Sequence, residues 1–437
     1  MKFYSLTTYW PIYVRTLEWV KLISLTGGFQ ILVQAISFVC GIFIIRMLPT
    51  QEYAYYTLAN LMLGSLTILV DGGITTSVMA LGGKVWKDRR KLGAVVVTGY
   101  EMRKHFAILV LVFAVPLFLY LFRYHGADWL TSVIILMALI PAFFTSLSGY
   151  VLMTGPALHQ DIVPVQKIEL GLGLGRGILL LFIFLFPFAY VAILAAGLPH
   201  VWGNMQLKKI SANYADWQQK PQPSIKKEIL GVVKRILPKS VFNSFSGQIT
   251  IWLITIFGST IAIAEIGALA RVSMVLAIFI SIIGTLVVPR YSRLASQRKI
   301  LFQRFWQILS GLFLVCVGIT GFVALFPTQL LWILGENYRG LEKELVLSIA
   351  GGCLNLMAVS LFTLATSRNW AFHPVWSISI IVFTMIAGII FIDITTLTGV
   401  LKFNLLVASI EGIMYFIYCL YKIQGVHEIS TTNHNIS

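Results

Sequence analysis

The chain has 437 residues, of which 58% are hydrophobic and 11% are charged, and its mean hydropathy is +0.84. Water-soluble globular domains have about a quarter charged residues, so the composition excludes that class and indicates an integral membrane protein. Basic residues that face anionic lipid headgroups explain the formal net charge of +16, so no nucleic acid is expected as a partner.

Apolar runs recur along the chain, and each is long enough to cross ~30 Å of hydrocarbon as a helix. The pattern predicts an all-α integral membrane protein with twelve transmembrane helices. In chain order they are expected at 22–48, 54–80, 104–123, 128–153, 168–187, 189–208, 238–259, 263–289, 305–326, 344–366, 374–392 and 397–421. The even number places both ends of the chain on the same side of the membrane.

The distribution of basic residues predicts the orientation of these helices. Most Lys and Arg residues precede the first helix, follow the second, fill the middle of the chain or follow the eighth helix. The positive-inside rule therefore predicts cytoplasmic N- and C-termini. Residues 1–21 are expected to form a cytoplasmic interfacial segment, and residues 423–437 a cytoplasmic tail.

The longest polar interval divides the twelve helices into six and six. It covers 211–237 and is expected to be a basic cytoplasmic linker between an N-lobe at 22–210 and a C-lobe at 238–422. The halves also correspond in sequence, because EYAYYTLANLMLGSLTILVDGG from Glu52 aligns with EIGALARVSMVLAIFISIIGTL from Glu265, at an offset of 213 residues. Because each half has an even number of helices, the second half begins on the same side of the membrane as the first. The halves are therefore expected to be parallel repeats with a substrate path between them.

Polar residues recur at helical spacing inside three of the predicted helices. The stripes are Gln30, Gln34, Ser37 and Gly41 in the first helix, Asn60, Gly64, Thr67 and Asp71 in the second, and Asn243, Gly247 and Thr250 in the seventh. Packing between helices would explain small and amide residues at this spacing. A water-filled central cavity is the alternative, and the charged residues favour it.

Several charged residues lie within or near the cores of the predicted helices: the cations Arg176, Arg271 and Lys402, and the anions Asp71, Glu169, Glu265 and Glu411. Arg271 is expected ~10 Å deep, and Glu265 is six residues away, which is the wrong spacing for a pair on one helix face. Arg176 and Glu169 are seven residues apart and could partly neutralise each other. Lys402 could reach the interface by snorkelling.

The cations favour an anionic substrate, because arginine grips diphosphate oxygens with a fork and lysine acts as a point charge. Coupling to H⁺ or Na⁺ would need a carboxylate such as Glu411 or Asp71. Asp71 could pair with the basic loop that begins at Lys84 when an inner gate closes, or nearby backbone could satisfy it. His200 could act as a protonation switch or bond a carbonyl that Pro199 frees.

No motif indicates catalysis. The chain has no P-loop, no H-E-x-x-H, no G-x-S-x-G and no cluster of Cys and His, so no catalytic residue, metal site or cofactor is expected.

Two segments resemble a known superfamily. RMLPTQEYA at 46–54, followed by DGG at 71–73, resembles the R-x-L-x-x-x-E-Y-G and D-x-G signature of Wzx-type polysaccharide flippases. These belong to the multidrug/oligosaccharidyl-lipid/polysaccharide (MOP) exporter superfamily, and Ala54 stands where their signature has glycine. Residues 258–294, with Arg271 and Pro289, are similar to a segment of MurJ-type lipid II flippases. MurJ-type members commonly have two further helices that are not predicted here, so the resemblance fits O-antigen export better.

The resemblance implies a V-shaped, MATE-like pair of six-helix lobes in the bacterial inner membrane. Alternating access would move an undecaprenyl-diphosphate-linked O-antigen unit or related oligosaccharide, a lipopolysaccharide precursor, from the cytoplasmic to the periplasmic leaflet. Lumen cations hold the diphosphate in this family, which points to Arg271 first and Arg46 second. Membrane lipids, a glycan polymerase and a chain-length regulator are the other partners expected.

The residues and the resemblance together give a candidate substrate site. Arg176 and Lys402 are lesser candidates for the diphosphate, and Gln30, Gln34, Asn60 and Asn243 would bond sugars or water. Two alternatives remain. A multidrug or cation antiporter of the same superfamily would need an acidic, aromatic lumen. A membrane glycan polymerase typically has a large outer catalytic loop, whereas the longest outer loop expected here covers only residues 327–344.

Overall fold

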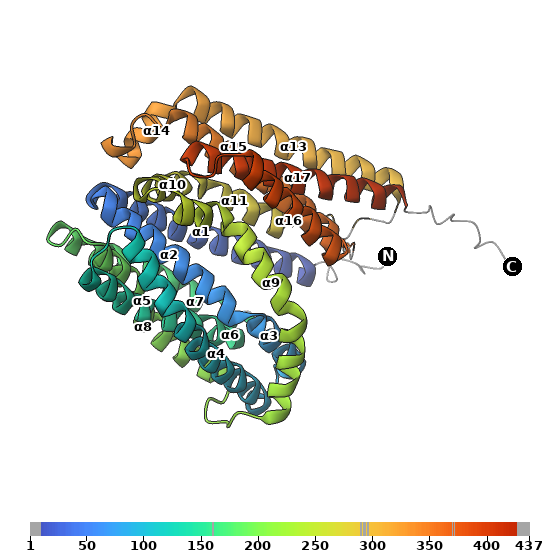
Figure 1. The fold of residues 1–437 in the computed structure, drawn as a ribbon. Helices are drawn as coiled ribbons and strands as arrows, with labels where there is room; N and C mark the ends of the chain where they lie inside the picture. The colour runs from blue at the N-terminus through green and yellow to red at the C-terminus, as the bar shows by residue number, and fades with distance from the viewer. Residues whose placement is uncertain are drawn as a thin grey trace, which may run out of the picture. The chain divides into compact units, whose positions relative to one another are not determined.

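A computed structural model of the chain describes residues 10–159, 161–288, 291, 294, 297–368, 370 and 372–425. These residues form helices and connecting turns, and no strand occurs among them (Figure 1). Seven of the described helices are long and apolar enough to cross a membrane. The expected all-α membrane fold is therefore confirmed. The chain divides into two compact units, unit 1 (Met1–Phe245) and unit 2 (Ser246–Ser437), and each is described by itself.

Unit 1 supplies the helices that correspond to the first six predicted spans. They are α1 (Trp10–Met47), α2 (Thr50–Asp71), α3 (Ile74–Val85), α4 (Arg89–Tyr124), α5 (Trp129–Leu152), α6 (Thr154–Leu158), α7 (Ile162–Leu180), the short 3-10 helix η1 (Leu181–Phe184) and α8 (Ala189–Tyr214). The boundary between the units falls within α9 (Pro223–Phe257).

Unit 2 continues with the second set of helices. They are α10 (Thr260–Ser273), α11 (Val275–Ile282), the π-helical turn η2 (Ile283–Val287), α13 (Arg298–Leu325), α14 (Pro327–Leu334), the 3-10 turn η3 (Glu336–Tyr338), α15 (Glu342–Ser367), α16 (Pro374–Phe391) and α17 (Leu397–Gln424). Each predicted span thus has a helical counterpart in the described part of the chain.

Helix packing follows the same scheme in both units. In unit 1, α5 packs against α8, α4 and α2, and α7 packs against α8. In unit 2, α15 packs against α17, α13 and α10, and α16 packs against α17. The helix that corresponds to the fourth predicted span of each half is therefore the central one, α5 in unit 1 and α15 in unit 2.

The second predicted span, 54–80, is not one helix. Gly72 (φ 45°) and Gly73 (φ 96°) adopt left-handed conformations that end α2 at Asp71, and α3 starts at Ile74. Glycine reaches positive φ without the steric cost that a Cβ imposes. The uninterrupted helix predicted for this span is wrong at the glycine pair.

The interval 211–237 is mostly helical. Helix α8 runs to Tyr214 and α9 begins at Pro223, so only residues 215–222 form the connection between them. Ile229 and Val233 are spaced at i and i+4 on α9, and both are buried against apolar side chains of α3 and α4. This apolar stripe explains why a basic, proline-containing segment forms a docked helix.

Side-chain caps fix two of the helix starts in unit 1. Asp88 accepts hydrogen bonds from the backbone N–H groups of Arg90 and Lys91 at the start of α4, and Asp128 accepts one from Thr131 at the start of α5. The bond from the Lys91 N–H is the main reason that the pKa of Asp88 lies below its ordinary value. Such caps satisfy N–H groups that have no partner within the helix.

The connection 215–222 packs tightly on α4, and this contact predicts a stability difference between two glycines. A Cβ at Gly93 would lie 2.2 Å from the carbonyl oxygen of Asp216, whereas a Cβ at Gly231 on α9 would meet nothing within 4 Å. We expect Gly93→Ala to lower the free energy of unfolding by about 1–3 kcal/mol, because backbone must move. Gly231→Ala should be neutral or slightly stabilising. Thermal unfolding of the purified variants measures both, and equal midpoints would contradict the packing described.

Candidate functional site

The most completely enclosed charged group in the described residues is an ion pair at the α2–α3 break. The Nη2 atom of Arg103, on α4, lies 3.3 Å from Oδ1 of Asp71, and the Arg103 and Asp71 side chains are 2% and 27% exposed. Asp71 also accepts hydrogen bonds from the backbone N–H groups of Gly73 (3.4 Å) and Thr75 (3.2 Å) and from the Thr75 hydroxyl. Arg103 Nη1 donates to that hydroxyl at 3.1 Å.

The partner of Asp71 is Arg103, at the far end of the basic segment that begins at Lys84, and backbone N–H groups of Gly73 and Thr75 also satisfy the carboxylate. Lys84 instead lies 3.8 Å from Glu228 on α9. The Arg103 guanidinium lies over the Tyr150 ring at 5.5 Å, so it joins the glycine break, α4 and α5. Its position keeps the charge out of lipid and fixes where α2 stops.

The sequence interpretation did not single out Arg103, which belongs to the basic residues that follow the second predicted helix. Its helical neighbours carried a usable signal: Val96, Gly99 and Ala107, at i−7, i−4 and i+4, are all buried. The face of the adjacent Lys104 includes the exposed residues Tyr100 and Ile108. An arginine on an apolar, small-residue face indicates a buried cation that needs a partner.

Arg176, on α7, is a second cation inside unit 1. Its Nη2 atom donates to the hydroxyl of Tyr56 on α2 at 3.1 Å, and its Nε atom is buried without a hydrogen-bond partner. No ion pair joins it to Glu169 among the described residues. The neutralisation considered for those two residues is therefore absent, and Arg176 keeps an uncompensated charge on a half-buried side chain.

The predicted sugar-binding residues have different environments. The Asn60 amide donates to the Tyr56 carbonyl one turn earlier at 2.8 Å, which leaves its own carbonyl oxygen as an acceptor. Gln34 is half-buried on α1. Gln30 lies on α1 and Asn243 on α9, and their side chains are outside the described part of the structure.

One residue of the R-x-L-x-x-x-E segment, Glu52, has a structural role. Arg46 lies exposed in the last turn of α1. Glu52 accepts a hydrogen bond of 2.7 Å from the Ala189 backbone N–H, the first residue of α8. The glutamate of the signature thus ties the start of α2 to the start of α8.

The candidates in unit 2 are Arg271, Lys402 and Glu411. Arg271 is half-buried near the end of α10, and its Nη1 atom lies 3.7 Å from the Met274 sulfur. Lys402 is exposed in the second turn of α17, and Glu411 is half-buried further along the same helix. Among these three candidates, Arg271 is the half-buried cation and Glu411 is the half-buried carboxylate.

A cavity of about 200 Å³ lies between α5, α7 and α8 in unit 1, and its mostly apolar lining also carries several polar side chains. Its polar lining includes Glu169, His200, Thr145 and Asn204. The Asn204 amide donates to the Thr145 carbonyl at 2.7 Å, which links α8 to α5. The cavity brings Glu169 and His200 together, although they are distant in sequence and lie on different helices.

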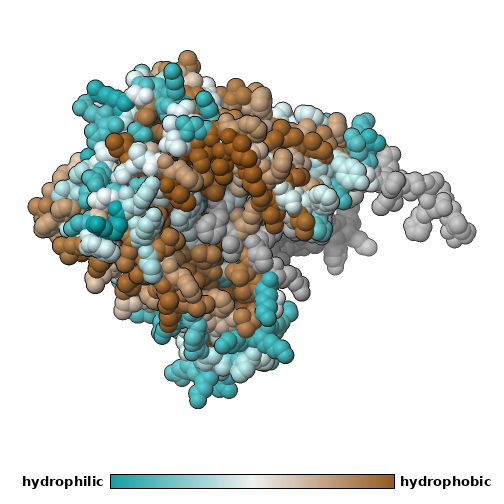
Figure 2. Space-filling model, viewed as in Figure 1, coloured by the Kyte–Doolittle hydropathy of each residue, from teal (hydrophilic) through white to brown (hydrophobic). Residues whose placement is uncertain are grey.

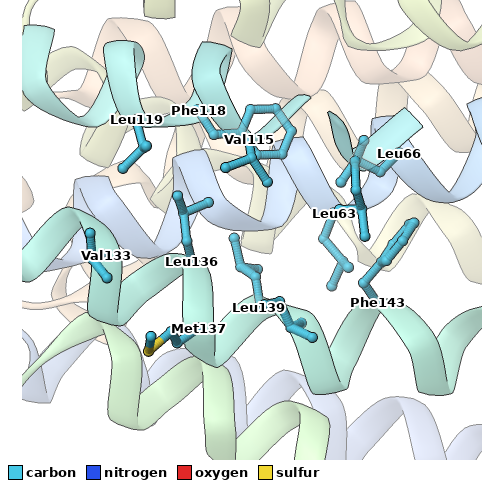
Figure 3. Close-up of a pocket in the computed structure, with 12 residues that line it drawn as sticks. Leu63, Leu66, Val115, Phe118, Leu119, Val133, Leu136, Met137, Leu139 and Phe143 are labelled. Atoms are coloured by element: carbon cyan, nitrogen blue, oxygen red, sulfur yellow. The ribbon is translucent and has the colours of Figure 1, made fainter. Parts of the chain in front are cut away.

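A second cavity of about 230 Å³, between α2, α4 and α5, is apolar (Figure 3). Figure 3 shows Leu63, Phe118, Leu136 and Phe143 pointing toward it, without a polar group among the labelled side chains. It contains none of the predicted site residues. A sugar or diphosphate has no hydrogen-bonding partner there.

Structural comparison identifies the fold. An inward-facing multidrug resistance MATE family transporter of the MOP superfamily is similar at a TM-score of 0.69, with 14% identity over 91% of this chain and 96% of that chain. A Pyrococcus furiosus MOP superfamily transporter, described as having a binding pocket of reversed polarity, gives 0.63, with 15% identity over 94% and 96%. A variant of the Vibrio cholerae MATE transporter VcmN gives 0.59, with 14% identity over 93% and 96%.

The fold is thus that of MATE and other MOP superfamily transporters. No protein-family model matches the sequence, and no curated protein matches it. At this level of identity the structural likeness establishes the fold alone.

The Asp71–Arg103 ion pair predicts an asymmetric response to mutation. Asp71→Asn leaves a buried cation unpaired and should lower the free energy of unfolding by about 3–5 kcal/mol. Asp71→Asn combined with Arg103→Met should recover much of this loss, because neither side chain then carries a charge. Thermal unfolding of the purified protein measures both.

Asp393→Asn is the matched control, because Asp393 is exposed and also accepts a backbone N–H bond, from Thr395 at 3.0 Å. It should shift the unfolding midpoint little. Equal destabilisation by Asp71→Asn and Asp393→Asn would contradict the importance of the buried pair.

Proposed function

We propose that this protein is a flippase for an undecaprenyl-diphosphate-linked oligosaccharide, an O-antigen or related unit. The observation that carries the proposal is Arg176, a half-buried arginine inside a membrane helix with no acidic partner among the described residues. A charge in this position is costly and is usually kept for function. A diphosphate supplies the missing anion.

The hydrogen-bonding capacity of Arg176 suits this substrate. Tyr56 takes one of its five N–H donors, and its buried Nε has no partner. A guanidinium can grip two phosphate oxygens at once. Arg271 in unit 2 is a second proposed phosphate contact, with Arg46 and Lys402 as further candidates.

Neutral groups would bind the sugar part of the substrate. The free carbonyl oxygen of Asn60 accepts hydroxyl groups, and its amide is held by Tyr56. Tyr56 on α2 therefore contacts both Arg176 on α7 and Asn60 on α2. It thus places the proposed phosphate-binding group next to the proposed sugar-binding group. Gln34, Gln30 and Asn243 complete the proposed polar surface.

Alternating access of the two six-helix repeats would carry the substrate from the cytoplasmic to the periplasmic leaflet of the bacterial inner membrane. The N- and C-termini are proposed to be cytoplasmic, by the distribution of basic residues. Glu411 is the proposed ion-coupling residue. Asp71 is proposed as a gating residue through its pair with Arg103, since the pair lies at the α2–α3 break.

A multidrug or cation antiporter is the second candidate. The cavity with Glu169 and His200 favours it, because an acid and a titratable ring in one membrane cavity suit proton exchange or a cationic cargo. A glycan polymerase is less favoured, because the MOP fold is known here from transporters.

Removal of the membrane cations tests the flippase. In a glycan-producing host, Arg176→Ala and Arg271→Ala should each reduce surface glycan at least about tenfold at unchanged protein level, since the loss of one charge-assisted hydrogen bond costs about 1.5–3 kcal/mol. Arg176→Lys should restore only part of the export because the fork is lost. Immunoblotting of surface glycan and of the protein measures these effects.

Two controls keep this experiment specific. Tyr56→Phe removes the bond to Arg176 but keeps the charge, so export should be reduced much less. Arg304→Ala removes an exposed cation on α13 that bonds Gln307 at 2.9 Å and should have no effect. Normal surface glycan in both Arg176→Ala and Arg271→Ala would refute the proposal.

Two further measurements separate the alternatives. A flippase defect leaves the lipid-linked unit in the cytoplasmic leaflet, whereas a polymerase defect leaves single units outside. Proton-coupled export of a cationic dye by purified protein in vesicles, lost in Glu169→Gln, would instead establish the antiporter.

A further inference from the structure

A basic pocket of about 600 Å³ lies in unit 1, apart from the residues assigned to transport. The end of α3, the first turns of α4, the connection 215–222 and the start of α9 form its walls, and it is lined by Leu81, Lys84, Val85, Arg90, Lys91, Ala94, Val95, Gln219, Gln222, Ile225 and Glu228. Figure 2 shows hydrophilic residues gathered at this end of unit 1, at the lower edge of the view. We call this cavity the basic pocket.

The charges that line the basic pocket are unequal. Lys84, Arg90 and Lys91 are three cations, whereas Glu228 is the single acid and lies 3.8 Å from Lys84. Lys91 lies 3.5 Å from Asp88, which is itself occupied as the α4 cap. Arg90 forms no ion pair or side-chain hydrogen bond with any described residue. The pocket therefore has cationic capacity left for an anion.

Acidic groups outside the lining do not cancel this charge. Asp216 accepts hydrogen bonds from the Gln219 side chain (2.6 Å) and the Gln218 backbone N–H (3.1 Å). These bonds, with smaller contributions from Arg89 and Arg90, hold the pKa of Asp216 below its ordinary value. Its carboxylate is committed to the turn, so the Arg90 guanidinium remains available.

The walls of the pocket are held in place by the backbone. The Asp216 N–H donates to the Arg89 carbonyl at 3.0 Å, and the Arg89 side chain donates to the Ala212 carbonyl at 2.7 Å. The Gln222 N–H donates to the buried Thr98 hydroxyl at 3.0 Å. The bonds from Asp216 and Gln222 tie the connection to α4, and the bond from Arg89 ties α4 to α8, so the pocket walls are arranged before any ligand arrives.

The remaining lining is apolar. Leu81, Val85, Ala94, Val95 and Ile225 form a hydrophobic wall beneath the cations. A small hydrated anion gains nothing from such a wall, whereas an amphiphile places its charged group on the cations and its apolar part on the wall. Pockets that bind organic ligands have volumes of several hundred Å³, and the volume of the basic pocket falls in that range. A single ion would need much less space.

The depth of the pocket fits the edge of a membrane. Helix α4 begins within the pocket and continues as one of the apolar candidate spans. Trp86 directly follows the lining residue Val85, and Tyr100 lies further along α4. They are 39% and 38% exposed, and such aromatic side chains favour the lipid–water interface. Basic pockets at this depth recognise phosphorylated headgroups.

We infer that the basic pocket binds the phosphate-bearing headgroup of a membrane lipid, with Arg90 and Lys91 as the principal phosphate contacts. An anionic phospholipid and an isoprenyl diphosphate present this same chemistry. The inference does not depend on the proposed transport substrate, because either lipid could occupy the pocket while a different molecule is transported.

The test compares lipids that differ in one feature. Native mass spectrometry of the purified full-length protein in a maltoside detergent would measure binding of phosphatidylglycerol, of an isoprenyl diphosphate, of diacylglycerol and of inorganic diphosphate. Diacylglycerol has acyl tails without phosphate, and inorganic diphosphate has phosphate without tails. We expect one or both phosphorylated lipids to bind more tightly than either reference compound, and their relative affinity identifies the source of the headgroup.

Charge-matched variants locate the site. Arg90→Gln with Lys91→Gln should weaken binding of the phosphorylated lipid about thirtyfold, from about 1 kcal/mol for each cation at a membrane surface. Lys208→Gln with Lys209→Gln removes the same charge from exposed positions on α8 and should have less than about a twofold effect. Equal thermal unfolding midpoints would confirm that both variants fold.

Three outcomes would overturn the inference. They are equal loss of lipid binding in the two double variants, no preference of the wild-type protein for phosphorylated lipid over diacylglycerol, and binding of inorganic diphosphate without lipid. Surface glycan export, measured in the same variants, reports on the transport proposal separately.

Discussion

Polar groups inside a membrane need partners within the protein, and this requirement shapes the described structure more than any other. Hydrocarbon offers no hydrogen bonds, so helices that satisfy their own backbone are the only open-ended elements that cross it. Hydroxyl side chains follow the same rule. Thr67, Ser146 and Ser360 each donate to a backbone carbonyl four residues earlier on their own helix. Asn60 does so with its amide.

Charged side chains satisfy this requirement in two different ways. Arg103 is enclosed by Asp71, Thr75 and Tyr150, so its charge is neutralised within the fold. Arg176 has a neutral tyrosine as its hydrogen-bonding partner and no acidic partner among the described residues, whereas the buried Nε atoms of both arginines lack a hydrogen-bond partner. Removing a charge from an enclosed pair weakens the fold, whereas removing an uncompensated charge acts on whatever anion it serves. This difference separates a structural cation from a candidate binding residue.

The sequence predicted the membrane class and the order of the helices because both follow from hydropathy summed over long segments. It failed where one backbone or side-chain geometry decides the outcome. Hydropathy runs straight through Gly72 and Gly73, so the break between α2 and α3 was invisible to it. Arg103 lies near the end of a predicted span, where a cation is ordinary. Its burial depends on Asp71, which is distant in sequence, and on the path that the glycine pair gives the chain.

The connection between the halves shows the same limit. Prolines and lysines in the interval 211–237 indicated a linker, yet Ile229 and Val233 bury one face of α9 against α3 and α4. Composition averages over all faces of a helix, whereas packing needs only one. The docking of that face also creates the basic pocket, because it brings Ile225 and Glu228 opposite the cations of α3 and α4.

The internal repeat relates two backbone irregularities that sequence similarity alone does not mark. At the offset of 213 residues, Gly72 and Gly73 correspond to positions 285 and 286, which lie within the π-helical turn Ile283–Val287. Both halves therefore interrupt the regular α-helical bonding at the same point of their second helix, one with left-handed glycines and the other with a wider turn. Single π-helical turns are uncommon and often occur at functional positions.

The chemistry around these interruptions has diverged. Arg271 of the second half corresponds to Leu58 in the first, which is completely buried. Asp71 corresponds to Gly284, so unit 2 has no acid at the place where unit 1 anchors Arg103. If packing alone required the interruption, the charges beside it would be expected to match as well. Instead, both halves keep an interruption of the second helix, while the charged residues near it lie at different positions. This favours a role for the interruption in bending the helix, and separate roles for Arg103 and Arg271.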